Sequence, residues 1–148
     1  MVNSKVRLQV RYGDLDTLGH VNNAVYLTYF ELGRIDYLRR ALGSLDISDI
    51  SFVIVHAEVD FKKPIHLHDT IFVETTVDGV GNSSIKFNHR IVGEDGELFA
   101  AGKTVAVWVD ANRQPVPVPD NVRRMILQTG ESVYGNQASD GGMNTSIT

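Results

Sequence analysis

The sequence predicts a single α+β domain in which one long helix covers the apolar face of an antiparallel sheet of about five strands. Two kinds of hydrophobic spacing carry this prediction. From Tyr26 to Ala41 the apolar residues recur every three or four positions, as on the buried stripe of a helix. Elsewhere apolar and polar residues alternate, which is the period of a half-buried strand, in the segments 6–10, 53–61, 71–77, 85–91 and 98–109.

The helix is the element that the sequence specifies in most detail. Its stripe consists of Tyr26, Phe30, Gly33, Tyr37 and Ala41, with Leu38 beside them, and Gly43 is a suitable stop. Glycine in a helix costs about 1 kcal/mol relative to alanine, so we expect another backbone to pack closely against Gly33. Glu31 and Arg34 are spaced to pair across one turn on the solvent-facing side.

The later strands are expected to follow one another as a meander, with Asp95-Gly96 as a hairpin turn. In the segment 52–61, alternation places Val53, Val55, Ala57, Val59 and Phe61 on one face and His56, Glu58 and Asp60 on the other. This strand would form a long apolar edge, which proteins normally cover or pair. We therefore expect a second copy to pair with it, giving a homodimer or homotetramer.

Composition limits the function further. The chain of 148 residues has no cysteine, which excludes a disulfide framework, a thiolate zinc site and a cysteine nucleophile. Its net charge of −4 argues against a nucleic-acid binder, which would need clustered Lys and Arg. No apolar run approaches the roughly 20 residues of a membrane span, so a cytoplasmic protein is expected. Residues 1–129 form the predicted domain, and the polar, glycine-rich segment 130–148 is expected to be a disordered tail.

The loop before the helix gathers the candidate chemistry. Asn22 is a candidate N-cap, which would leave the amide of Asn23 unpaired at the positive end of the helix dipole. A turn at Gly19 would return the carboxylate of Asp16 to the same place. A carboxylate beside an oxyanion site is an arrangement of hydrolases. The alternative is that Asp14 and Asp16 only shape a turn and that the asparagines only cap the helix.

The segment "DLDTLGHVNNAVYLTYFELGR" resembles the signature of hotdog-fold acyl-CoA thioesterases of the 4-hydroxybenzoyl-CoA thioesterase group, and it is also similar to plant acyl-ACP thioesterases. Later segments, "VDFKKPIHLHD" and "GKTVAVWVD", resemble later strands of the same family. The resemblance implies a hotdog fold with Asp16 as the catalytic carboxylate, Asn23 as the oxyanion amide and His20 as a functional histidine. The plant pattern has an asparagine where this chain has Leu18, which favours an aspartate-led mechanism.

The resemblance also implies that two units pair into one continuous sheet, that coenzyme A enters near the dimer seam, and that no metal or cofactor is needed. Tyr26 is a candidate for the acyl pocket or for the core. His56 and Glu58 either approach the site from the partner or lie on a solvated face. The candidates for contacts with coenzyme A phosphates are Lys62, Lys63, Arg90 and Lys103.

The remaining histidines have simpler interpretations. His66 and His68 are spaced like a pair of metal ligands next to Asp69, but they follow Pro64 at a turn and are expected to be polar loop residues. His89 alternates with apolar residues, so we expect a core or interface histidine.

The predicted function is hydrolysis of acyl-CoA or acyl-carrier thioesters, with Asp16 as nucleophile or general base. Two alternatives remain at this point. One is a non-catalytic acyl-CoA-binding hotdog protein, since one fold hosts many functions. The other is a dehydratase of 3-hydroxyacyl thioesters. The sequence specifies neither the acyl chain nor the carrier.

Overall fold

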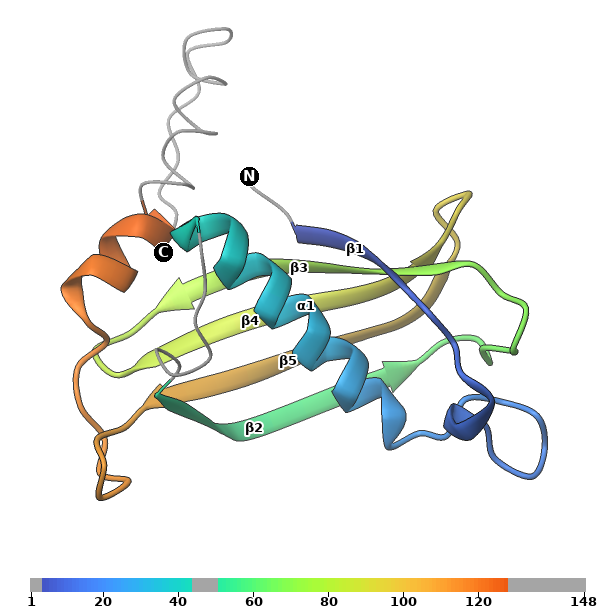
Figure 1. Cartoon of the computed structure of the whole chain (residues 1–148), viewed down its shortest axis with the longest axis horizontal. Helices are drawn as coiled ribbons and strands as arrows, with labels where there is room; N and C mark the ends of the chain where they lie inside the picture. The colour runs from blue at the N-terminus through green and yellow to red at the C-terminus, as the bar shows by residue number, and fades with distance from the viewer. Residues whose placement is uncertain (1–3, 44–50, 128–148) are drawn as a thin grey trace, which may run out of the picture.

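The computed structural model describes residues 4–43 and 51–127; the expected end of the domain at residue 129 and the tail 130–148 lie outside this part. The described chain forms one antiparallel sheet with a long helix, α1 (Val25–Leu42), across one face (Figure 1). The strands are β1 (Ser4–Leu8), β2 (Phe52–Phe61), β3 (Ile71–Val80), β4 (Ser84–Gly93) and β5 (Leu98–Trp108). A short 3₁₀ helix, η1 (Tyr12–Asp14), precedes α1, and residues 120–127 are helical. The predicted α+β architecture is confirmed.

The order of strands in the sheet differs from the expected meander. Only β3, β4 and β5 follow one another as neighbours, while β1 pairs with β3 and β2 pairs with β5, giving the order β1-β3-β4-β5-β2. The segment 62–70 therefore carries the chain from one edge of the sheet to the far side. The alternation along a strand indicates which of its faces is buried, but it does not indicate which other strand will pair with it. The expectation that β2 lies at an edge is confirmed.

A β-bulge changes the face of β2 that meets the helix. Ala57 lies opposite Thr104 and Ile54 opposite Ala106, two residues that are buried on the α1 side, and the register shifts between Ile54 and His56. One extra residue reverses the phase of the alternation. The predicted face is therefore right for Ala57 onward and wrong for Val53.

The helix packs mainly on β1 and β3, and its buried residues are those of the predicted stripe together with Tyr29 and Arg34. A methyl group at Gly33 would lie 2.2 Å from Thr75 Oγ1, so side chains of β3, and not another backbone, fill the space beside this glycine. The core has two apolar clusters. Tyr26, Tyr29 and Phe30 anchor the first, and Tyr37 and Leu38 anchor the second, which also includes side chains of the helical residues 120–127.

Between the clusters lies a buried polar layer. His89 is 1% exposed, as expected for a core histidine, and its ring nitrogens lie 3.2 Å from Thr75 Oγ1 and 2.9 Å from Thr104 Oγ1. Arg34 is also buried, with 7% exposure, and Nη1 donates to Thr104 Oγ1 at 3.5 Å. The prediction that Arg34 pairs with Glu31 in solvent is wrong, because the side chain turns inward over the sheet.

Candidate active site

The loop between η1 and α1 folds back on itself at Gly19. The amide of Asp16 donates to the carbonyl of His20 at 2.7 Å, and the amide of Gly19 donates to the carbonyl of Asp16 at 3.1 Å. Gly19 has φ +80°, a left-handed conformation in which other residues are strained. The turn that the sequence predicts at Gly19 is therefore present, and it brings Asp16 and His20 together.

The carboxylate of Asp16 is exposed and held from one side only. Its Oδ1 accepts hydrogen bonds from the amides of Leu18, at 2.9 Å, and His20, at 3.1 Å. Its Oδ2 makes no hydrogen bond to any residue that the structure describes. Two backbone donors thus fix the orientation of the group while one oxygen remains available for a ligand.

The start of α1 differs from the predicted capping. The helix begins at Val25 with Ala24 as N-cap residue, and no side chain caps it. Asn22 instead closes a turn before the helix, because its Oδ1 accepts from the amide of Ala24 at 3.0 Å and its carbonyl from the amide of Val25 at 2.9 Å. The amide of Asn23 has no acceptor among the described residues. The expected free amide is thus found in a turn just before the helix.

These groups share one cavity, with a volume of about 280 Å³. The loop contributes Asp16, His20 and Asn23, and the helix contributes Tyr26. Phe61 at the end of β2 and the residues after it complete the lining, which consists of Asp16, His20, Val21, Asn23, Tyr26, Phe61, Lys62, Lys63 and Pro64. Six residues that the sequence singles out as site candidates therefore line a single space.

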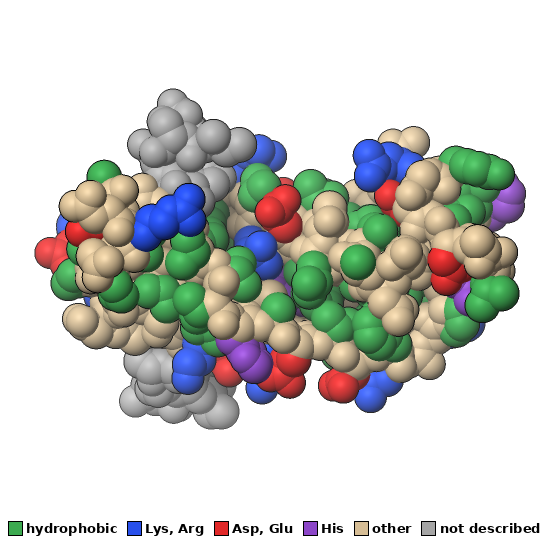
Figure 2. Space-filling model, turned by 90° about the horizontal axis from the view of Figure 1, so that it is seen from below, with side chains coloured by type: hydrophobic (Ala, Val, Ile, Leu, Met, Phe, Trp, Pro, Cys, Tyr) green, Lys and Arg blue, Asp and Glu red, His purple; other side chains and the backbone are tan. Residues whose placement is uncertain are grey.

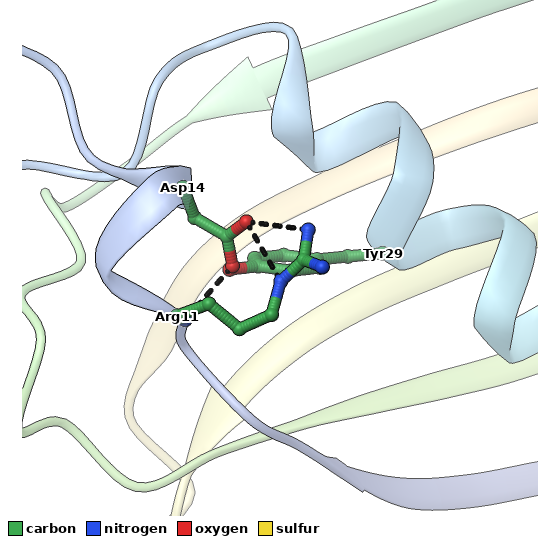
Figure 3. Close-up of polar contacts among 3 residues, drawn as sticks. All are labelled: Arg11, Asp14 and Tyr29. Carbon is green, nitrogen blue, oxygen red and sulfur yellow. Dashed lines mark hydrogen bonds and ion pairs between the residues drawn. The ribbon is translucent and has the colours of Figure 1, made fainter.

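The buried carboxylate of Asp14, two residues before Asp16, holds the loop to the helix (Figure 3). Asp14 is 2% exposed and accepts hydrogen bonds from the hydroxyl of Tyr29, at 2.9 Å, and from the backbone and side chain of Arg11, at 2.9, 3.2 and 3.0 Å. Burial alone would raise the pKa of Asp14, but these hydrogen bonds outweigh it and hold the pKa below the usual value. Its carbonyl also accepts from the amide of Asn22, at 2.8 Å.

The contrast between the two aspartates separates their roles. Both oxygens of Asp14 are occupied by donors and the side chain is buried, so Asp14 is a structural anchor of the loop. Asp16 is exposed, lines the cavity and has one oxygen without a partner among the residues described. The sequence shows only two carboxylates two residues apart, and the i, i+15 relation between Asp14 and Tyr29 carries no local signal that would reveal the anchor.

Charged and polar side chains line the cavity or lie next to one of its lining residues. The ring of His20 meets the ring of His66 edge-on, with centroids 4.9 Å apart, and His66 Nδ1 lies 3.5 Å from Asp69 Oδ2. Lys63 forms an ion pair with Glu97, which raises the pKa of Lys63. A carboxylate, an imidazole and two lysine side chains therefore line the cavity, and the ammonium group of one of these lysines, Lys63, is paired with Glu97.

The structure places the other predicted contacts elsewhere. His56 and Glu58 alternate with Ala57 on the outer face of the sheet, away from α1, with His56 Nε2 3.2 Å from Glu58 Oε1. Arg90 lies on the same outer face and donates to Glu74 at 3.0 Å. Glu58, Arg90 and Lys103 line a separate hollow of about 340 Å³. Within one protomer these residues do not meet Asp16, and their participation in a site completed by a partner stays a prediction.

Comparison with known proteins assigns the family. A family model described as the thioesterase-like superfamily matches residues 10–126, which include the loop, the helix and every strand from β2 to β5. The chain belongs to the thioesterase-like superfamily. This chain is therefore a member of a family of thioester hydrolases.

Two curated relatives of this thioesterase-like chain differ in substrate by name. An acyl-acyl carrier protein thioesterase of Arabidopsis thaliana chloroplasts, ATL3, is 32% identical over 80% of this chain, which spans only 65% of that relative. An acyl-CoA thioesterase of Haemophilus influenzae, YbgC, is 31% identical over 78% of this chain and 88% of the relative.

Solved structures confirm the hotdog fold. A thioesterase of Thermus thermophilus, described as complexed with coenzyme A and zinc, is 43% identical, with a TM-score of 0.75 over 82% of this chain and 95% of that one. In the part of this chain that the structure describes, no three His, Asp or Glu side chains are arranged to hold a metal. The same part contains no helix with the length and apolar character needed to cross a membrane.

Proposed function

We propose that this protein hydrolyses acyl-CoA thioesters to a free acid and coenzyme A, with Asp16 as the reacting carboxylate. The observation that carries the proposal is the cavity that Asp16 and Asn23 share, because an oxygen of Asp16 and the amide of Asn23 have no partner among the described residues. Coenzyme A is favoured over an acyl carrier protein because the 43% identical relative is described with coenzyme A bound.

The chemistry requires few groups. A thioester carbonyl gains negative charge on oxygen when it is attacked, and a backbone amide at the start of a helix stabilises that charge. Asp16 either attacks the carbonyl, which expels the thiolate and leaves an anhydride that water then hydrolyses, or takes a proton from a water that attacks the carbonyl. The leaving thiolate is stable, since cysteine-like thiols have pKa values near about 8.5, so a general acid contributes little. His20 lines the same cavity and is placed to contact the ligand.

Asp16→Asn tests the proposal. An asparagine Oδ1 can still accept from the amides of Leu18 and His20, so the loop should keep its shape while the free oxygen is replaced by a neutral amide nitrogen. We expect kcat to fall at least about 100-fold. The assay follows thiol release from a panel of acyl-CoA and acyl-carrier substrates. Asp78→Asn is the control, because it makes the same change at an exposed carboxylate of β3 that does not line the cavity.

Each result of this assay has a definite meaning. Thiol release by the wild type that is lost in Asp16→Asn and kept in Asp78→Asn supports the aspartate-led mechanism. Near-wild-type turnover by Asp16→Asn rejects it. Binding of acyl-CoA by the wild type without thiol release would instead support a non-catalytic acyl-CoA-binding protein, and loss of water from a 3-hydroxyacyl thioester would support a dehydratase. A cytoplasmic location stays a prediction of the sequence.

The protein is proposed to act as at least a dimer through the edge strand β2. This strand pairs with β5 on one side only, and it exposes Ile54, Val55 and Phe61, with Val55 58% exposed. Figure 2, which shows the molecule from the side of β2 in Figure 1, has hydrophobic side chains across the middle of this face. A second copy that pairs antiparallel along β2 would cover both the apolar side chains and the open backbone groups.

Ala57→Arg tests this assembly, because Ala57 lies at the middle of β2 and arginine there would collide with a paired copy. Light scattering is expected to show a dimer or tetramer for the wild type and a smaller species for the variant, with activity falling together. Asn112→Arg, in an exposed turn, should change neither. A fully active monomeric wild type would refute both the assembly and a site shared between protomers.

A further inference from the structure

Tyr26 carries a buried hydroxyl that has no hydrogen-bond partner among the described residues. The side chain is 2% exposed and lines the cavity of Asp16 and Asn23. Its hydroxyl makes no hydrogen bond to any residue in the described ranges 4–43 and 51–127. Buried hydroxyl groups nearly always have a hydrogen-bond partner, and that partner can be water or a ligand. The cavity beside it is the space in which such an acceptor can sit.

Tyr29, the neighbouring tyrosine of the same helix, has a hydroxyl with a structural role. Tyr29 follows Tyr26 by three residues, and the two ring centroids are 6.3 Å apart. The hydroxyl of Tyr29 donates to Asp14 at 2.9 Å and so fastens the loop. Of these two neighbouring buried tyrosines, Tyr29 is bonded to the loop anchor, whereas Tyr26 has no partner in the described part of the chain.

The position of Tyr26 is fixed before any ligand arrives. Its ring meets the ring of Phe61 edge-on, with centroids 4.9 Å apart, and it belongs to the apolar cluster under the first half of α1. Burial raises the pKa of Tyr26 above its ordinary value, so the hydroxyl keeps its proton throughout the neutral range. A rigid, permanently protonated donor stabilises developing charge without having to reorganise during the reaction.

We propose that the Tyr26 hydroxyl donates a hydrogen bond to the carbonyl oxygen of the bound thioester and acts beside the amide of Asn23 as a second oxyanion donor. The inference rests on the proposed thioesterase function. The carbonyl oxygen is the fitting acceptor because it has two lone pairs, whereas a thioester sulfur accepts hydrogen bonds weakly. Asn23, in the turn before α1, and Tyr26, in the first turn of α1, both line the cavity, so one carbonyl oxygen there can meet both donors.

Tyr26→Phe removes the hydroxyl and keeps the ring. We expect kcat to fall about 10- to 100-fold while KM changes less than about threefold, because the bond strengthens as the oxygen becomes charged. We also expect the melting temperature to stay within about 2 °C of the wild type or to rise, since no hydrogen bond to a described residue is lost. Tyr29→Phe should lower the melting temperature, because it removes a donor from the buried Asp14 carboxylate.

Tyr37→Phe is the matched control for activity. Tyr37 is a buried tyrosine of the same helix whose ring lies against Phe87 in the second cluster, away from the cavity, so its kcat should stay within about twofold of the wild type. The wild type is first assayed by thiol release from acyl-CoA substrates, and all three variants are then compared on the best substrate.

The outcomes separate this inference from the proposed function. An active wild type with a Tyr26→Phe variant that loses kcat, keeps KM and keeps its melting temperature supports the role of Tyr26. An active wild type with Tyr26→Phe within about twofold in kcat overturns the inference alone. A melting temperature of Tyr26→Phe as low as that of Tyr29→Phe overturns it too, because the hydroxyl would then be bonded within the protein. A wild type that releases no thiol overturns the proposed function and this inference with it.

Discussion

The buried histidine in the polar layer makes the stability of this fold depend on pH. His89 is enclosed by the ring of Phe30, stacked at 4.5 Å, and by Thr75 and Thr104, which lie next to its two nitrogens. Burial lowers the pKa of His89 to about 3, and the nearby charge of Arg34 contributes in the same direction. The folded protein therefore holds this imidazole neutral throughout the neutral pH range.

The size of the effect follows from proton linkage. A histidine in the unfolded chain takes up a proton near pH 6.5, whereas the folded protein does so only near pH 3. The stabilising contribution is complete above about pH 6.5 and is lost progressively as the pH falls from there toward 3, because the unfolded state alone gains protons. Between pH 7 and pH 5 this amounts to about 2 kcal/mol of unfolding free energy.

Urea unfolding at pH 7 and pH 5 measures this loss, with His89→Gln as the matched variant because its amide is polar and does not titrate. Asp14 and Asp36 also have lowered pKa values, but they occur in both proteins and cancel in the comparison. We expect the wild type to lose about 2 kcal/mol more than the variant. Equal losses in the two proteins would refute the reasoning. An imidazole C–H signal of His89 whose chemical shift titrates near pH 6.5 in the folded wild type would refute it independently of the variant.

Two further predictions concern backbone positions. Gly102→Ala should lower the unfolding free energy by about 1–3 kcal/mol, because the new methyl group would lie 2.4 Å from a ring carbon of Phe30 and 2.5 Å from the carbonyl oxygen of Glu58. Thermal unfolding measures this loss, and Gly13→Ala is the control because its methyl group would have no atom within 4 Å. Asn23→Pro removes the proposed oxyanion amide and should fold yet lose at least about 10-fold in kcat, whereas Asn23→Ala keeps the amide and most of the activity. Full activity of a folded Asn23→Pro would show that another group is the donor.

Much of the site could be predicted because it is local in the chain. Asp16, His20 and Asn23 lie within eight consecutive residues, and a turn at Gly19 is enough to bring Asp16 and His20 together. The helical stripe was equally readable, since burial of one helix face leaves a period that survives in the sequence. The same spacing predicted the wrong environment for Arg34, because a residue at the margin of the stripe can turn its long side chain either to solvent or over the sheet.

The sequence by itself determined the strands, the helix, the loop with its carboxylate and the face of the helix that is buried, because each of these follows from contacts between residues close in the chain. Only the tertiary structure decided that β2 leaves the meander for the far edge and that Lys62 and Lys63 come to line the Asp16 cavity. It also decided that Tyr29 holds Asp14, while the hydroxyl of Tyr26 has no partner in the described ranges. These outcomes depend on pairings between distant segments. A side chain carries no mark of which distant partner will satisfy it until the packing of the whole sheet has fixed their distance.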